Sequence, residues 1–276
     1  MSDARIGLIA GNGRLPVLVA RGMRAHGLEV HAAGLRGEYD PELAAECASL
    51  VPVGLARPGS WIRVLRRAGV REAVMVGGVA KRRAHDPLRI IRLLPDLRAI
   101  RLWYRRLRHD RRNAALLAAL ADELASEGLR LIDSTTHIPE HLAGPGVMGR
   151  VQPTDRQRGD IDFAWPILQA AAAHDIGQSI AACDRDVIAV EAVEGTAAMI
   201  ARAGTLCRSK GWTLLKTAKA DHDMRADVPT IGVETVRQVQ AAGGGCIAVG
   251  AGSVILIDRP AVIAAADAAG IAIVGR

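Results

Sequence analysis

The residues best suited to chemistry lie in one stretch of the C-terminal half, between Lys216 and Gly232. Three acids and three bases fall there within twelve residues: Lys216, Lys219, Asp221, Asp223, Arg225 and Asp227. In an extended segment one side carries Asp221, Asp223, Arg225 and Asp227, and in a helix Asp223 and Asp227 are still neighbours. Carboxylates, a guanidinium and lysine charges together suit a hard cation such as Mg²⁺ beside a phosphate. A solvated, salt-bridged loop is the alternative interpretation.

Two glycine turns follow predicted strands in the N-terminal half. Arg5–Ala10 and Glu72–Val76 are short apolar runs, and each is followed by glycines at the end of the strand. Ligands of parallel α/β sheets gather beyond the carboxyl ends of the strands. The residues at these two turns are Gly11, Gly13, Arg14, Gly77 and Gly78. Pro16 stands where a dinucleotide fingerprint has its third glycine, so we expect a nucleotide-friendly loop only, or glycines that merely turn the chain.

A second phosphate-friendly turn is predicted in the C-terminal half. Val187–Val190 reads as a strand paired in a hairpin with Ile180–Ala182, and it leads into Glu191, Glu194, Gly195 and Thr196. Thr196 can cap a helix over residues 197–203. Acids followed by a glycine and a helix N-terminus can hold a phosphate and its cation together.

The alternation of strands and helices predicts two α/β domains. We expect a Rossmann-like N-terminal domain with a parallel sheet over residues 1–133, and a second α/β domain with a mixed sheet over residues 161–276. Between them, glycines and prolines interrupt residues 134–160, which we take as a linker. The second domain is expected to begin with a helix from about Asp162 to His174.

The net charge of +7 is concentrated in one segment. Residues 81–112 contain twelve Lys or Arg and three acids, a charge of +9 that leaves the rest of the chain at −2. After Pro95 the pattern predicts a basic amphipathic helix carrying Trp103 and Tyr104 on its apolar side. We expect that side to pack on the sheet. Contact with an anionic membrane surface is the more specific alternative. With few aromatic residues and no recognition motif, a nucleic-acid partner is not expected.

Cysteine spacing and hydropathy indicate a reduced, cytoplasmic protein. Cys47, Cys183, Cys207 and Cys246 are far apart and form no C-x-x-C pair. No apolar run approaches the length of about 20 residues that a membrane-spanning helix needs. The N-terminus lacks the features of a secretory signal.

Six motifs in order along the chain resemble those of the LpxI-type UDP-2,3-diacylglucosamine pyrophosphatases. The matching segments are Ile9–Pro16, Gly34–Gly37, Val76–Val79, Asp175–Gln178, Val190–Thr196 and Arg225–Gly232. The resemblance implies Mg²⁺-dependent hydrolysis of UDP-2,3-diacylglucosamine to 2,3-diacylglucosamine 1-phosphate (lipid X) and UMP, a step of lipid A biosynthesis at the cytoplasmic face of the inner membrane. It also implies two domains that clasp this lipid-linked nucleotide-sugar substrate.

The resemblance further implies roles for individual residues. Asp227 matches the key catalytic aspartate, and we expect it to hold Mg²⁺ or orient water together with Asp223 or Glu191. Arg225 and Lys219 are expected to neutralise phosphates. Two loops match parts that line the substrate site: Gly11 and Gly13 in the first domain, and Glu194, Gly195 and Thr196 in the second. The chain departs from the family pattern at Ala220 and His222, where relatives often have Pro and Gln.

A non-catalytic nucleotide or nucleotide-sugar binding protein is the main alternative. Such a protein would bind UDP-sugars and release no UMP. The sequence leaves the oligomeric state open, and a homo-oligomer is one expectation.

Overall fold

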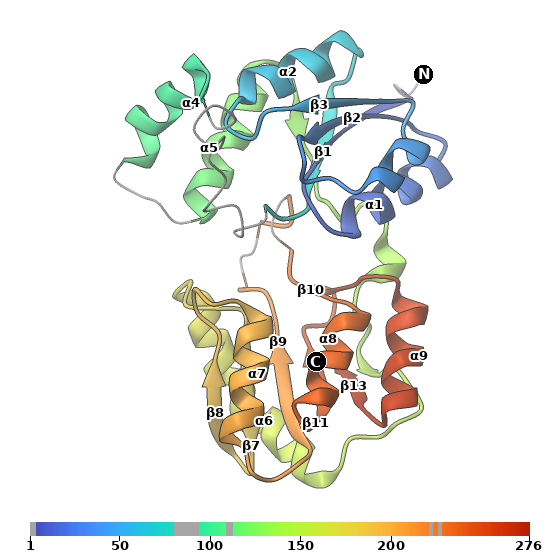
Figure 1. The fold of residues 1–276 in the computed structure, drawn as a ribbon, viewed down its shortest axis with the longest axis vertical. Helices are drawn as coiled ribbons and strands as arrows, with labels where there is room; N and C mark the ends of the chain where they lie inside the picture. Colours follow the sequence, from blue (N-terminus) through green and yellow to red (C-terminus); the bar gives the residue numbers. More distant parts are fainter. Residues whose placement is uncertain (1–3, 80–93, 109–112, 221–222, 226–227) are drawn as a thin grey trace. The chain divides into compact units, whose positions relative to one another are not determined.

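The computed structural model describes residues 4–79, 94–108, 113–220, 223–225 and 228–276 (Figure 1). The chain forms two compact units. Residues 1–139 and 223–227 make up the first, and residues 140–222 and 228–276 make up the second. The stretch richest in acids and bases is therefore shared, because it leaves the second unit after strand β9 and returns to it at Val228.

The first unit is built on a five-stranded parallel sheet with the order β3-β2-β1-β4-β5. Helices alternate with its strands, as the sequence pattern predicts. The strands are β1 (Arg5–Ala10), β2 (Glu29–Leu35), β3 (Ser49–Val53), β4 (Glu72–Val76) and β5 (Arg130–Leu131). The helices are α1 (Leu15–Ala25), the 3₁₀ helix η1 (Pro41–Glu46), α2 (Pro58–Arg67), α4 (Leu97–Leu102), the π-helical turn η3 (Trp103–Leu107) and α5 (Asn113–Ser126).

Apolar side chains cover both faces of this sheet. Ile9 and Ala73 join a buried cluster with Leu65 of α2 and Leu124 of α5. Helix α1 packs on β1 and β2 and buries its apolar side chains, among them Met23. Strands buried on both faces are typical of parallel sheets, and this explains why β1 reads as a continuous apolar run.

The basic helix after Pro95 differs from the expectation. Its apolar side does not pack on the sheet: Leu97 is 83% exposed, Tyr104 67%, Trp103 46% and Ile100 43%. The helix is anchored differently, through buried Leu102 and through Arg98, which binds Glu123 and Glu127 of the α5 region. The spacing of apolar residues in a helix does not show which side of that helix an ion pair will hold against the rest of the protein.

The second unit contains a six-stranded mixed sheet with the order β6-β13-β11-β9-β7-β8. Strands β9, β11 and β13 are parallel, β7 is antiparallel to both β9 and β8, and β6 is antiparallel to β13. The strands are β6 (Gly146–Val147), β7 (Ser179–Cys183), β8 (Asp186–Val190), β9 (Trp212–Lys216), β11 (Gly244–Val249) and β13 (Ala272–Gly275). A separate parallel pair joins β10 (Thr230–Ile231) to β12 (Ile255–Leu256).

Helices cover both faces of the six-stranded sheet. One core lies under α7 (Thr196–Leu206), α8 (Val233–Ala241) and α9 (Arg259–Ala269), and the other lies under α6 (Asp155–Ala173). Helix α6 begins earlier than expected, because Thr154 and Gln157 form a capping box inside the stretch taken as a linker. A short 3₁₀ turn, η4 (Pro139–His141), precedes β6.

The predicted hairpin of β7 and β8 is confirmed. Its two turn residues, Asp184 and Arg185, both have positive φ angles, 54° and 58°, as a tight two-residue turn requires. Taken together, the units confirm the predicted fold class: a parallel Rossmann-like sheet in one and a mixed α/β sheet in the other. In the described part of the chain, no helix combines the length and apolar character needed to cross a membrane.

Candidate functional site

In the first unit, the two predicted glycine turns lie against each other. The backbone N–H of Gly11 donates to Val76 O at 2.9 Å, and the N–H of Asn12 donates to Gly78 O at 2.7 Å. A Cβ atom at Gly11 would stand 2.4 Å from Gly78 O, so no larger residue fits without moving the loops apart. Position 77 also requires glycine, because its φ angle of +94° is one that residues with a Cβ atom rarely adopt.

These turns lie at the point where the strand order of the sheet reverses. Strands β1 and β4 are neighbours in the sheet. The chain continues from β1 to β2 on one side of this pair and from β4 to β5 on the other side. Open α/β sheets bind ligands in the crevice beyond such a switch point. Gly13, with φ +92°, would place a Cβ atom in open space, so the backbone there is accessible. The roles of the four glycines in substrate binding stay predictions.

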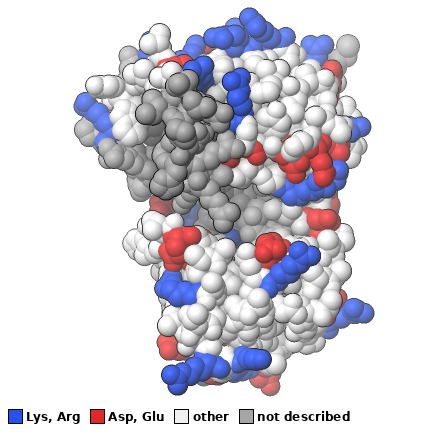
Figure 2. Space-filling model, viewed as in Figure 1, with Lys and Arg blue, Asp and Glu red and all other residues white. Residues whose placement is uncertain are grey.

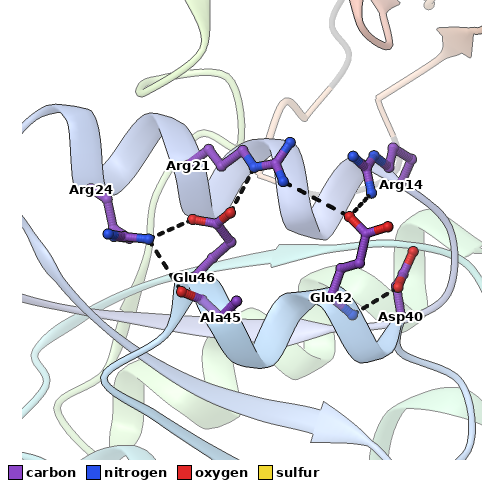
Figure 3. A network of polar contacts seen from close by, with 7 residues as sticks. All are labelled: Arg14, Arg21, Arg24, Asp40, Glu42, Ala45 and Glu46. Carbon is purple, nitrogen blue, oxygen red and sulfur yellow. Dashed lines mark hydrogen bonds and ion pairs between the residues drawn. The ribbon is translucent and has the colours of Figure 1, made fainter.

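Arg14, between the glycine loop and α1, is engaged with a neighbouring element (Figure 3). Its guanidinium binds the Glu42 carboxylate on η1. Two further arginines of α1, Arg21 and Arg24, bind Glu46 at 2.7 Å each and hold the pKa of that carboxyl below its usual range. A substrate phosphate would therefore compete with Glu42 for Arg14, whose role in binding stays a prediction.

Residues 223–225, in the segment between β9 and β10, belong to the first unit. Ser134, which is 1% exposed, donates both its backbone N–H and its hydroxyl to Met224 O at 2.9 Å. Beside Met224, Arg225 Nη2 binds Asp223 Oδ2 at 2.6 Å and Nε binds Asp223 Oδ1 at 2.8 Å. This pairing, followed by the charge of Asp122, raises the pKa of Arg225.

Two of the three residues predicted to be catalytic are thus brought together. The third, Asp227, lies outside the described residues, and so do Asp221 and His222. The convergence predicted for this stretch is seen for Asp223 and Arg225. Their roles in catalysis or metal binding stay predictions.

In the second unit, charged side chains meet where β8 and β9 end. These two strands run in the same direction because each is antiparallel to β7 between them. Lys216, the last residue of β9 and 8% exposed, donates from Nζ to Thr196 Oγ1 at 2.9 Å. The Thr196 hydroxyl donates in turn to Glu191 Oε1 at 2.9 Å. An ammonium, a hydroxyl and a carboxylate therefore form one chain of hydrogen bonds.

The second carboxylate oxygen of Glu191 gives this group an unused acceptor. Among the described residues, Glu191 Oε2 is buried without a hydrogen-bond partner. The backbone around Glu191 is fixed, since its N–H donates to Ser179 O at 2.9 Å and a Cβ atom at Gly177 would stand 2.0 Å from its carbonyl oxygen. Buried acceptors usually have a donor or a cation, so Glu191 fits the predicted role of a metal ligand.

No complete metal cluster is seen in the described ranges. There, no three His, Cys, Asp or Glu side chains come together in a way that could hold an ion. Both oxygens of Asp223 face Arg225, whereas Glu191 keeps one oxygen available. Mg²⁺ often keeps several waters and takes only one or two carboxylates from the protein, so a single such acid is compatible with it.

Both ends of the loop from Glu194 to Thr196 make side-chain hydrogen bonds. Glu194 accepts from Arg202 at 2.6 Å, and its own backbone N–H and then Arg202 lower the pKa of its carboxyl. The expectation that Thr196 caps α7 is wrong: Gly195 is the N-cap residue, with φ +84°, and no side chain caps the helix. The Thr196 hydroxyl instead donates a hydrogen bond to Glu191. Lys219 binds Asp175 Oδ1 at 3.2 Å.

Two of these residues had no specific role predicted from the sequence. Lys216 appeared there only as a point charge of the acid and base stretch, and Ser134 had no predicted role. A lysine directly after four buried strand residues, 212–215, is a usable signal, because it marks the position where the strand ends. Ser134 offers no such signal, since its partner Met224 is ninety residues away.

The fold and these two groups of residues define a two-domain α/β protein with strand ends suited to phosphate groups. Residues 5–141 match the model of the LpxI N-terminal domain, and residues 144–274 match that of the LpxI C-terminal domain. The chain is 32% identical over 279 residues to the UDP-2,3-diacylglucosamine pyrophosphatase LpxI of Caulobacter vibrioides, covering 98% of this chain and 97% of that protein. The chain belongs to the LpxI family.

Among solved structures, glycinamide-RNase-transformylase T from Mycobacterium tuberculosis shares 17% identity with the chain. The match covers 68% of this chain and 44% of that one, with a TM-score of 0.23. A likeness at this level carries no argument about fold or function.

Proposed function

We propose that the chain hydrolyses the pyrophosphate bond of UDP-2,3-diacylglucosamine and releases 2,3-diacylglucosamine 1-phosphate and UMP. The observation that carries this proposal is the match to the UDP-2,3-diacylglucosamine pyrophosphatase LpxI of C. vibrioides, which covers 98% of the chain. The local geometry supports it, because both halves present strand ends suited to phosphate: a glycine crevice in one and the Lys216–Thr196–Glu191 chain in the other.

The reaction places specific demands on these residues. A water oxygen forms a bond to one phosphorus while the bond from that phosphorus to the bridging oxygen breaks, and the other phosphate leaves with the bridging oxygen. Negative charge builds up on the phosphate oxygens, and catalysis is mostly positioning plus electrostatic stabilisation. We assign Lys216 the neutralisation of this charge, with Thr196 held in place between Lys216 and Glu191. Arg225 and Lys219 remain proposed phosphate partners.

Magnesium is the proposed cofactor. When bound, Mg²⁺ would neutralise phosphate oxygens and help to lower the pKa of the attacking water. The residues proposed to hold it are Asp227 together with Asp223 or Glu191. The unused, buried Oε2 atom of Glu191 favours Glu191 as the second acid.

The substrate also suggests where the protein works. A glucosamine that carries two acyl chains partitions into membranes, whereas its UDP group faces water. We therefore propose a cytoplasmic protein that meets its substrate at the cytoplasmic face of the inner membrane, in lipid A biosynthesis. A homo-oligomer remains an untested expectation.

The test is incubation of the purified chain with UDP-2,3-diacylglucosamine and Mg²⁺, with UMP followed by chromatography. We expect UMP and the lipid 1-phosphate in equal amounts, and loss of both when EDTA is present. Release of UMP that EDTA does not change would overturn the magnesium assignment alone.

A non-catalytic nucleotide-sugar binding protein is the competing function. It predicts saturable binding of UDP-2,3-diacylglucosamine in calorimetry with no UMP released at any Mg²⁺ concentration. Binding without turnover by the folded protein would therefore favour that alternative over hydrolysis.

A further inference from the structure

A basic groove lies on the first unit, away from the glycine loops. It has a volume of about 650 Å³ and runs between α2, the start of α4 and the end of α5. Four arginines and two acids line it: Arg63, Arg66, Arg67, Arg98, Asp96 and Glu127. Figure 2 shows Lys and Arg side chains along the edge of this unit that carries α2. Neither the glycine loops nor the Lys216 group takes part in this surface.

The four arginines divide into two pairs. Arg98 binds Glu123 and Glu127 at 2.6 Å each, and Arg66 binds Glu127 at 2.8 Å, so these charges are balanced within the protein. Arg63 and Arg67 are exposed and make no ion pair with any residue that the structure describes. They are four residues apart on α2 and therefore neighbours on one face of the helix. The groove thus presents two uncompensated positive charges to solvent.

Exposed apolar side chains begin at the groove and continue along α4 and η3. Leu97 lines it and is 83% exposed, and Ile100, one turn further along α4, is 43% exposed. Trp103 and Tyr104 follow in η3, at 46% and 67% exposure. Trp and Tyr are enriched at membrane interfaces, where their apolar rings and polar atoms are both accommodated. Exposed Leu and Ile side chains beside arginines match a surface that lies at the boundary of headgroups and acyl chains.

The surface is held in a fixed shape by Asp96. Its Oδ1 accepts from Ala99 N at 2.8 Å and caps α4, while its Oδ2 accepts from Gly59 N at 2.8 Å in the first turn of α2. One carboxylate therefore joins the two helices that carry the arginines and the apolar side chains. A preformed surface loses less conformational entropy on binding.

We propose that this groove docks the protein on a bilayer containing anionic phospholipid, with Arg63 and Arg67 on the headgroup phosphates and Leu97 and Ile100 at the acyl boundary. This deepens the proposed contact with the inner membrane by naming the surface and the lipid class. A nucleic acid would also attract the arginines, but it would leave Leu97 and Ile100 in water.

The test is co-sedimentation of the full chain with vesicles of phosphatidylcholine, with and without phosphatidylglycerol. The wild type is expected to bind only the phosphatidylglycerol vesicles and to be released by salt. Each cation near an anionic surface contributes about 1 kcal/mol, or about fivefold in partition coefficient. Arg63→Glu/Arg67→Glu should therefore lower partitioning by at least about 25-fold. Leu97→Ser/Ile100→Ser should lower it by about tenfold or more with the charge unchanged.

The matched control is Arg208→Glu/Arg237→Glu, which makes the same change of charge at exposed positions of the second unit. It should bind vesicles like the wild type, and circular dichroism should show all variants folded. Equal binding by the Arg63/Arg67 variant, equal binding to neutral vesicles, or binding to duplex DNA without binding to vesicles would each overturn the proposal. Because no nucleotide substrate is present, these results are independent of the proposed hydrolysis.

Discussion

Replacing Lys216 with Met tests the chemistry of the second unit most closely. The change keeps an unbranched side chain at a position that is 8% exposed, and removes the ammonium that donates to Thr196 at 2.9 Å. Thr196 and Glu191 then lose the one positive charge in their hydrogen-bonded chain. A hydrogen bond that involves a charged group contributes about 1.5–3 kcal/mol, and we expect the free energy of unfolding to fall by about that amount.

The effect on turnover should be larger than a loss of stability can explain. Removing one preorganised donor from developing negative charge lowers kcat by about 10²–10³-fold, equivalent to about 2.7–4 kcal/mol. We therefore expect kcat for UMP release to fall by about this factor while KM changes little. Lys216→Arg keeps the charge and should restore part of kcat.

The assay is steady-state release of UMP, with urea unfolding measured on the same preparations. Lys210→Met is the matched control, because Lys210 is exposed and precedes β9, at the opposite end of the strand from Lys216. It should keep wild-type turnover. A Lys216→Met protein that is folded and turns over within about threefold of the wild type, an effect below 1 kcal/mol, would refute the role given to Lys216.

Three further changes test other parts of the structure. Gly11→Ala would place a Cβ atom 2.4 Å from Gly78 O, and urea unfolding should show a loss of about 1–3 kcal/mol; a loss near zero would mean that the two loops can separate freely. Burial raises the pKa of Asp160, so the folded state keeps a proton that the unfolded chain releases above its ordinary value of about 4. Stability should therefore fall as pH rises through the raised pKa, and Asp160→Asn should flatten that fall in urea melts at successive pH values. Ser134→Ala removes one of two hydrogen bonds to Met224 O and should lower the free energy of unfolding by about 1 kcal/mol, and the segment that carries Arg225 should then exchange its amide protons faster.

Much of the fold could be predicted from the sequence because its signals are local. Continuous apolar runs predicted the buried strands, and glycines after β1 and β4 marked the turns that meet in the structure. The antiparallel β7–β8 hairpin followed from the turn residues between two short strands. In each case the feature depends on neighbours in sequence or on one rule of sheet topology.

The errors come from contacts between distant residues. The side of the basic helix that faces the protein depends on the ion pairs of Arg98 with Glu123 and Glu127. The spacing of residues within the helix does not predict these pairs. Helix α6 begins at Asp155 because of a capping box that the surrounding glycines and prolines obscured. Likewise, the link between Lys216 and Thr196 requires knowing that β8 and β9 run in the same direction on either side of β7.

The most direct test of the proposed enzyme is a single-turnover measurement with UDP-2,3-diacylglucosamine, comparing the wild type with Asp227→Asn in the presence of Mg²⁺. We expect the wild type to convert the substrate to UMP, and the variant to be folded and at least about 100-fold slower. Wild-type protein that binds the substrate and forms no UMP, or a variant that is as fast as the wild type, would contradict the proposed reaction or the role of Asp227.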